Sequence, residues 1–317
     1  MAASTHRDTP APGHQLAQPW ASEENPGLSA KVKRVVHRPA GLVWFVLRRQ
    51  QNHPGLTLLA LLGVVLAVGL VTSATFFADG VERAILQQKL DAFSEMTGRP
   101  PFSTSVYVFP SARKPLSLQE AEELAGHVGA TLAGEVGLRV KHLGVRVESG
   151  TMMLQPAEGS TLYGDQLLLD SVDVVYVAEV VPHIDVTAGE PMDEGSSSGG
   201  VMDVWVHARL AEDMGLHVGD PLKMGRTVAE AGVPLRVRGF WQATDPTEPF
   251  WFNNPDETLK KALLVRRRDY INFVEPLIAA KTRYVNWHVI LDERQVFPER
   301  ARQYIAGFER GLGVLNK

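Results

Sequence analysis

The sequence predicts an α+β protein: one N-terminal transmembrane helix, then a mixed extracytoplasmic domain of antiparallel strands and short helices. The first observation is an apolar run of 23 residues, Gly55 to Phe77, in a stretch between Arg49 and Asp79 that has no charged residue. The second is that β-rich runs and helical patterns follow one another irregularly over residues 99–317. The third is the composition of the 317 residues, 44% hydrophobic and 21% charged, which excludes a disordered chain, a disulfide scaffold and a multi-span bundle.

Charge and cysteine usage exclude several further classes. The chain has 32 Lys plus Arg against 36 Asp plus Glu, so its formal charge is -4, and it contains no cysteine. A slightly acidic chain produces no general field that attracts nucleic acid, and we expect no nucleic-acid partner. The absence of cysteine excludes catalytic thiols, iron–sulfur ligation and thiolate zinc sites.

The segment before the apolar run divides in two. Residues 1–29 hold few large apolar side chains and are predicted to form a disordered cytoplasmic tail. Residues 30–53 interleave basic with apolar side chains. This pattern is typical of an amphipathic segment that lies in the headgroup region and binds membrane lipid, and it fits an ordinary juxtamembrane cluster of basic residues equally well.

Residues 54–78 are predicted to form the transmembrane helix. At 1.5 Å per residue the apolar run can cross a hydrocarbon core of about 30 Å. A buried core helix would usually carry a polar stripe, and a signal peptide would have a much shorter basic lead than the roughly fifty residues here. Residues 1–53 carry seven Lys or Arg and three Asp or Glu, whereas Asp79 and Glu82 open the other flank. The positive-inside rule therefore predicts a plasma-membrane protein with a cytoplasmic N-terminus and an extracytoplasmic main domain.

Residues 79–98 are predicted to continue the span as a stalk helix. Val81, Ala84, Ile85, Leu90 and Phe93 recur close to helical spacing. The pair at 100–101, both proline, is expected to end the helix.

Residues 99–317 are expected to form the extracytoplasmic core domain. Ser117 and Glu120 match a capping box that begins a helix over 118–129. Ser149-Gly150 separates two β-rich runs and predicts a hairpin turn. The other expected elements are strands at 104–109, 172–181, 201–207, 233–243, 262–266 and 284–291, helices at 208–214, 269–280 and 298–312, and loops at 191–200 and 245–256.

Two glycine positions are predicted to be needed for folding and not to contact a ligand. Gly219-Asp220 follows a short helix and precedes a strand, so Gly219 is expected to take a positive φ while Asp220 bonds backbone amides of the turn. Gly239 lies inside the strand predicted at 233–243 and is expected to be needed for folding in the same way.

The sequence shows no catalytic motif or constellation. The chain lacks a Walker A loop and a His-Glu-x-x-His motif, and no spacing selects a common site among the candidate acids Asp165, Asp170, Asp173 and Asp185. His207 and His217 fall on different elements and are interpreted as core or solvated histidines. We therefore expect no catalytic residue, no cofactor, no metal site and no enzyme activity.

The tract from Gly195 to Gly199 matches the nucleophile-elbow pattern literally. That motif works by placing its serine on a strained turn from a strand into a helix, whereas this tract precedes a strand. A flexible Ser/Gly linker is the favoured interpretation.

One aromatic segment is a candidate surface. Phe240, Trp241, Phe250, Trp251 and Phe252 surround a proline-rich loop. They could form a peptide-binding or lipid-binding patch, and the favoured interpretation is that they pin the loop onto the core.

Three runs carry a family resemblance: HIDVTAGEP at 183–191, VWVHARLAEDMGLHVGD at 204–220 and LRVRGFW at 235–241. Together with the basic lead and the single span they resemble the FtsX-like permease subunits of ABC transporters that carry a MacB-like periplasmic core domain. The resemblance implies a cytoplasmic ABC ATPase as a separate chain, a second permease copy or remaining permease half, and coupling of the ATPase to export or to an extracytoplasmic partner. The family has further spans after this domain and this sequence stops at Lys317, so the expectation is an N-terminal part of such a permease.

Two other functions fit the same pattern. A single-pass, membrane-anchored binding or sensor protein is the alternative. A membrane-tethered hydrolase is disfavoured, because the sequence shows no catalytic constellation.

Overall fold

The computed structural model describes residues 44, 45, 48, 54–160, 163–164, 166–193 and 195–316. These residues belong to two compact units, residues 1–79 and residues 80–317. The predicted tail at 1–29 lies outside the described residues, and so does the predicted juxtamembrane segment at 30–53 apart from residues 44, 45 and 48.

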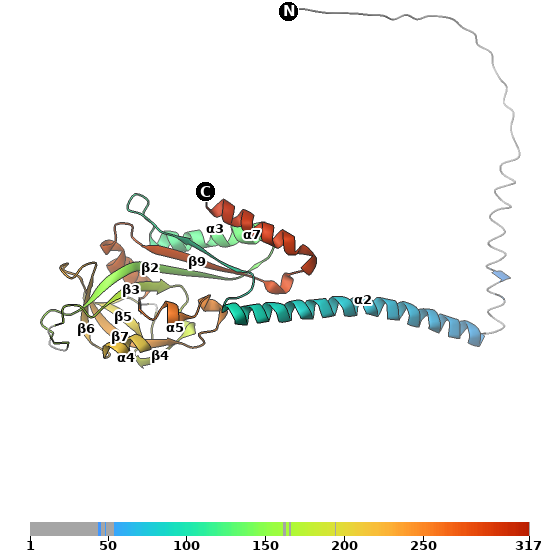
Figure 1. Ribbon diagram of the computed structural model, residues 1–317, viewed down its shortest axis with the longest axis horizontal. Helices are drawn as coiled ribbons and strands as arrows, with labels where there is room; N and C mark the ends of the chain where they lie inside the picture. The colour runs from blue at the N-terminus through green and yellow to red at the C-terminus, as the bar shows by residue number, and fades with distance from the viewer. Residues whose placement is uncertain are drawn as a thin grey trace, which may run out of the picture. The chain divides into compact units, whose positions relative to one another are not determined.

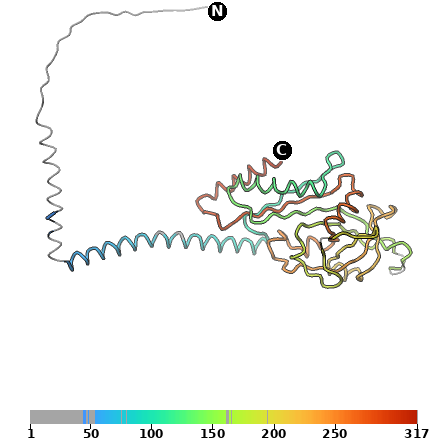
Figure 2. Tube along the Cα trace, turned by 180° about the vertical axis from the view of Figure 1, so that it is seen from behind, coloured from blue at the N-terminus to red at the C-terminus, as the bar shows by residue number. Residues whose placement is uncertain are grey.

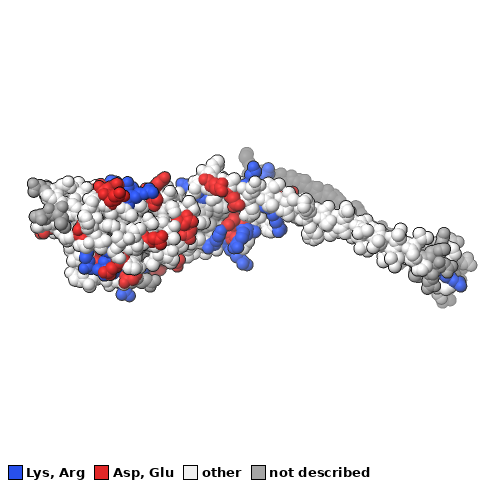
Figure 3. Space-filling model, turned by 90° about the horizontal axis from the view of Figure 1, so that it is seen from below, with Lys and Arg blue, Asp and Glu red and all other residues white. Residues whose placement is uncertain are grey.

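Helix α2 (Pro54–Thr97) contains the apolar run. Among the described residues it is the one helix long and apolar enough to cross a membrane. Its large apolar side chains from Leu56 to Phe77 are each between 53% and 75% exposed, and Figure 3 shows this stretch without charged side chains. The large apolar side chains of this stretch are therefore exposed, unlike those of a buried core helix. The helix ends at Thr97 because Gly98 takes a φ of 64° and donates its N–H to the Ser94 carbonyl at 2.8 Å, ahead of the predicted proline stop.

The second unit is built on a nine-stranded sheet, counted over the described residues (Figure 1). The strand order is β1-β9-β2-β3-β8-β5-β7-β4, and β6 pairs with β2 and β7. Most pairs are antiparallel, and β3 with β8 and β5 with β7 are parallel. The fold class is as predicted, α+β. The strands are β1 (Ser103–Val108), β2 (Val140–Pro156), β3 (Asp170–Val177), β4 (Ile184–Gly189), β5 (Met202–His207), β6 (Pro221–Gly225), β7 (Val233–Ala243), β8 (Ala262–Leu264) and β9 (Tyr284–Leu291).

Strand β2 corrects the prediction of a hairpin at Ser149-Gly150. The strand runs straight through these residues, and its register with β3 shifts between Glu148 and Thr151. One extra residue is absorbed as a bulge, with Gly150 at a φ of 74° and the Ser149 hydroxyl accepting the Val174 N–H at 2.9 Å. The pair is a break in the ladder and not a reversal of the chain.

Two helices, α3 (Leu118–Val136) and α7 (Ala301–Leu315), lie side by side over one face of the sheet (Figures 1 and 2). The predicted capping box begins α3, with Glu120 N–H donating to the Ser117 hydroxyl at 3.2 Å. A Cβ on Gly307 of α7 would lie 2.6 Å from the Glu135 carbonyl oxygen of α3. Only glycine at this position allows so close a contact between the two helices.

The remaining helices are α4 (Ala208–Met214), α5 (Pro255–Thr258) and α6 (Arg267–Asp269). The single helix predicted at 269–280 is wrong. Helix α6 passes into a π turn at Tyr270–Val274 and a 3-10 turn at Glu275–Leu277. Pro276 has no N–H to donate to the helix ladder, so a regular α-helix cannot continue through it.

A second apolar core covers the opposite face of the sheet beneath the loop at 245–256. Trp205, Trp241, Phe250 and Trp251 pack together there, and all four are buried. Because the middle strands are covered on both faces, all six residues of β5 are buried, although their sequence alternates as in a half-exposed strand.

Candidate functional site

A mostly apolar cleft in the second unit lies beside the last turns of α2. It has a volume of about 590 Å³ and is formed by α2, the start of β1 and one side of α7. The principal lining side chains are Leu86, Leu90, Phe93, Phe102, Tyr304, Ile305, Phe308 and Leu312.

Helical spacing explains both walls of this cleft. Leu86, Leu90 and Phe93 are separated by four and three residues, so they share one face of α2. Leu86 is partly buried against the main core, whereas Phe93 is 49% exposed. Ile305, Phe308 and Leu312 form a second apolar stripe on α7, beside the stripe at 304, 307 and 311 that packs toward the core.

Side-chain contacts join the end of α2 to two other segments of the chain. Arg83 and Arg300 lie over the Phe297 ring, with 5.5 and 5.6 Å between each guanidinium carbon and the ring centre. Arg99 donates to Asn253 Oδ1 at 3.2 Å and lies 5.6 Å from the Phe252 ring centre. The end of the helix is therefore attached both to the segment before α7 and to the aromatic loop.

The model of the MacB-like periplasmic core domain family matches residues 57–274, more than two thirds of the chain. The chain belongs to this family. It is a membrane protein of the ABC transporter permease family with an extracytoplasmic domain, and the predicted resemblance is confirmed.

The MacB-like domain is also similar to a crystal structure of a domain assigned to a permease protein from Porphyromonas gingivalis. The two share 14% sequence identity at a TM-score of 0.31, over 58% of this chain and 69% of that chain. No curated protein sequence matches the chain.

The aromatic side chains at 250–252 of the MacB-like domain pin their loop onto the core, as the favoured interpretation predicted. Phe250, Trp251 and Phe252 are at most 8% exposed. The His183 ring stacks on Phe250 with 3.6 Å between ring centres, and its Nδ1 lies 2.8 Å from a Glu248 carboxylate oxygen. The loop is thus pinned onto the sheet and presents no aromatic patch at 250–252.

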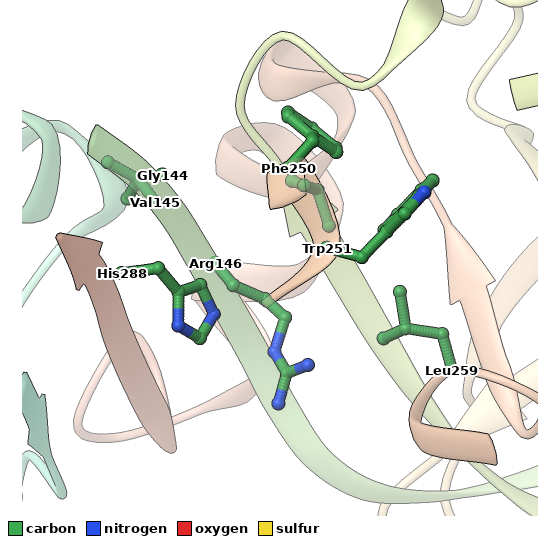
Figure 4. Close-up of a pocket in the computed structure, with 8 residues that line it drawn as sticks. Gly144, Val145, Arg146, Phe250, Trp251, Leu259 and His288 are labelled. Carbon is green, nitrogen blue, oxygen red and sulfur yellow. The ribbon is translucent and has the colours of Figure 1, made fainter. Parts of the chain in front are cut away.

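A small cavity lies under this loop, and Figure 4 shows Arg146 of β2 and His288 of β9 projecting from the same side of the sheet. Its volume of about 20 Å³ is close to that of a single water site, so it holds no organic ligand. The Arg146 Nε lies 2.8 Å from a Glu148 oxygen. Burial is the main cause that lowers the pKa of His288, and together with the nearby Arg146 and His142 it brings this pKa to about 3.

The loop that carries the Gly195–Gly199 tract is anchored at its centre, which corrects the favoured flexible linker. The Ser197 hydroxyl donates to Asp269 Oδ2 at 2.9 Å, and the Ser197 N–H donates to Asp269 Oδ1 at 2.7 Å. The same hydroxyl accepts the Asp203 N–H at 2.7 Å. Because its hydroxyl is bonded to a buried carboxylate and not to a histidine, Ser197 has a structural role.

The histidines and acids named from the sequence do not converge. His207 is buried and its Nε2 lies 3.2 Å from Asp256 Oδ1, whereas the His217 side chain is 83% exposed. The pKa of His207 is lowered, mainly by burial, although Asp256 acts in the opposite direction. Among the candidate acids Asp170 pairs with Lys261 at 2.9 Å, Asp173 lies on β3, Asp185 is exposed on β4, and Asp165 lies outside the described residues. Over the described part of the chain no three His, Asp or Glu side chains are placed to hold a metal ion.

The turn at 219–220 has the predicted geometry. Gly219 takes a φ of 92°, and an Asp220 carboxylate oxygen accepts the His217 N–H at 2.7 Å. A Cβ on Gly239 would lie 2.9 Å from the Ala188 carbonyl oxygen, which explains the glycine inside β7. The cleft beside α2 was not predicted. The second apolar stripe of the last helix was the signal for it, although the partner of that stripe lies more than 200 residues away in sequence.

Proposed function

We propose that this chain is a permease subunit in which a separate cytoplasmic ATPase drives movement of α2, and that α2 passes this movement to the MacB-like domain. Residues 1–53 are cytoplasmic and the domain lies outside the membrane. The observation that supports this proposal is the apolar cleft, across which one face of α2 faces the side of α7. A displacement of Leu86 or Leu90 along this cleft would repack α7, and the close contact at Gly307 would carry the change to α3.

The same proposal assigns no ATPase or hydrolase activity to the chain itself. ATP hydrolysis in a purified complex must then come from a bound partner chain. A second permease chain would complete the transporter, and the work of the ATPase would drive export or act on an extracytoplasmic partner.

Cysteine labelling tests the orientation. Because the chain has no native cysteine, an introduced cysteine is the one position of this chain that the reagent can label. The variants are Trp20→Cys, before the span, and Ser196→Cys, which is exposed in the MacB-like domain. In intact cells an impermeant maleimide should label position 196 and should reach position 20 only after permeabilisation. The opposite pattern would refute the orientation.

A matched pair of substitutions tests the coupling. Leu90→Gln changes a cleft residue of α2, and Ile85→Gln makes the same change at a side chain that is 51% exposed and outside the cleft. Each full-length variant is purified with its co-purifying ATPase. The measurement is how strongly the rate of ATP hydrolysis depends on the presence of the permease chain. Leu90→Gln should reduce this dependence severalfold, whereas Ile85→Gln should leave it close to wild type. Co-purification without any ATPase would contradict the proposal and favour the single-pass binding protein.

A further inference from the structure

Over the part of the chain that the structure describes, strand β1 forms one end of the sheet and pairs only with β9. The Leu291 N–H donates to the Phe102 carbonyl at 3.0 Å, which identifies residues 102 and 291 as a hydrogen-bonded antiparallel pair. Because such pairs alternate along an antiparallel ladder, residues 104, 106 and 108 direct their backbone groups toward β9. Ser103, Ser105 and Tyr107 therefore direct their N–H and C=O groups outward, and over the described residues these groups have no backbone partner.

This edge lacks the features that usually protect a free strand. Residues 103–108 contain no charge and no proline, and their register with β9 runs without a bulge. Natural proteins usually block such edges, since an unprotected strand of this length pairs with other chains. Its six residues extend over roughly 20 Å, enough to pair with a five- or six-residue segment.

Aromatic side chains stand beside the same edge. Tyr107 and Phe109 are 60% and 61% exposed. With Tyr284 they form a cluster whose ring centres are 5.1 to 6.0 Å apart. The backbone of an added strand would form hydrogen bonds with the edge of β1. Alternate side chains of the added strand would pack against this aromatic cluster.

The charges at the two ends of β1 indicate the kind of partner. Arg113 and Lys114 follow the strand in a tight turn, both are exposed, and neither forms a salt bridge among the described residues. Arg99 precedes the strand, and among the described residues it contacts an amide and an aromatic ring without forming a salt bridge. Antiparallel pairing of two copies through β1 would bring these like charges together, so a second copy of the chain is disfavoured.

We propose that the outer edge of β1 binds an extended segment of a partner protein by strand addition. The segment is uncharged where it pairs with Ser103, Ser105 and Tyr107. It carries an acidic residue where it passes Arg113 and Lys114. An antiparallel arrangement places this acidic residue at the N-terminal end of the segment.

A direct binding measurement uses the full-length chain in detergent micelles and the fluorescent peptide acetyl-Asp-Val-Thr-Val-Thr-Val-amide. Ser105→Pro removes an outward N–H and leaves the ladder with β9 intact, while the control Ser105→Ala keeps the N–H. Both variants lose the bond from the Ser105 hydroxyl to Asn286, so their difference isolates the backbone group. Binding should be saturable, Ser105→Pro should weaken it about tenfold, and Ser105→Ala should change it less than about twofold.

A charge exchange tests the recognition of the acidic residue and does not depend on proline. The double variant Arg113→Glu with Lys114→Glu should weaken binding of the Asp peptide and should prefer a peptide that begins with Lys. Absence of saturable binding to the wild type, or equal binding by Ser105→Pro and Ser105→Ala in folded protein, would overturn the proposal. A failure here would leave the labelling and ATPase results of the permease proposal unaffected, so the two proposals can fail separately.

Discussion

His288 should make the stability of the MacB-like domain depend on pH. Its side chain is 5% exposed, its ring stacks on Phe252 with 4.7 Å between centres, and its Nδ1 has no hydrogen-bond partner among the described residues. Burial, the largest cause, together with the adjacent Arg146 and His142 lowers its pKa to about 3. The folded domain therefore holds this ring neutral over most of the acidic range.

The sign and size of the effect follow from proton linkage. An unfolded histidine has a pKa near 6.5, so between pH 6.5 and 3 the unfolded chain binds a proton that the folded domain does not. The contribution of His288 to stability is present above pH 6.5 and is lost as the pH falls. At pH 5 the loss amounts to about 2 kcal/mol, or a decrease of roughly 4 to 8 °C in Tm for a domain of this size.

The assay compares the thermal unfolding of full-length wild type and His288→Gln in detergent at pH 7.5 and pH 5, followed by near-UV circular dichroism. Between pH 7.5 and pH 5 the Tm of His288→Gln should decrease by roughly 4 to 8 °C less than the Tm of the wild type. This difference does not depend on how stable His288→Gln is at pH 7.5. The comparison cancels the opposite effect of Glu148 and Asp173, whose pKa values burial raises. His127→Gln, at an exposed position on α3, is the control. Equal pH dependence in the wild type and His288→Gln would refute the reasoning.

Three further substitutions test how the fold is held together. Gly219→Val should destabilise the domain by about 1–3 kcal/mol in chemical denaturation through backbone strain alone, because φ is 92° and no atom lies within 4 Å of the new Cβ; wild-type stability would contradict this, and loss of partner binding in a stable variant would make the turn a recognition element. Gly307→Ala should lower Tm by separating α7 from Glu135 of α3, whereas Gly313→Ala, with open space around its Cβ, should not. Ser197→Ala should increase protease cleavage in the loop at 191–200 by releasing it from Asp269, and unchanged cleavage would show that the hydroxyl does not anchor it.

Local signals predicted much of the fold. The capping box of α3, the end of α4 at Gly215 with a φ of 64°, and the bounds of β7 all agree with the sequence analysis. Each depends on interactions within a few residues or on the alternation of one strand. The same holds for the exposed apolar run of α2, because its composition alone keeps it out of a soluble core.

Contacts between residues far apart in the sequence could not be predicted from such short-range patterns. Ser197 meets Asp269 across 72 residues, and that bond turns a Ser/Gly tract of linker-like composition into an anchored loop. The bulge in β2 depends on a hydrogen bond to β3. Without knowledge of this partner strand, the pair Ser149-Gly150 predicts a turn.

The sequence by itself determined the helix that is long and apolar enough to span a membrane, the α+β class and the family of this chain, because composition and short-range periodicity carry that information. Only the tertiary structure decided that β5 is covered on both faces, that α2 and α7 share a cleft, and that β1 is left as a free edge. The physical reason is that burial and strand order depend on which surfaces meet. A sequence pattern records which face is apolar, and it does not record the partner that the face contacts.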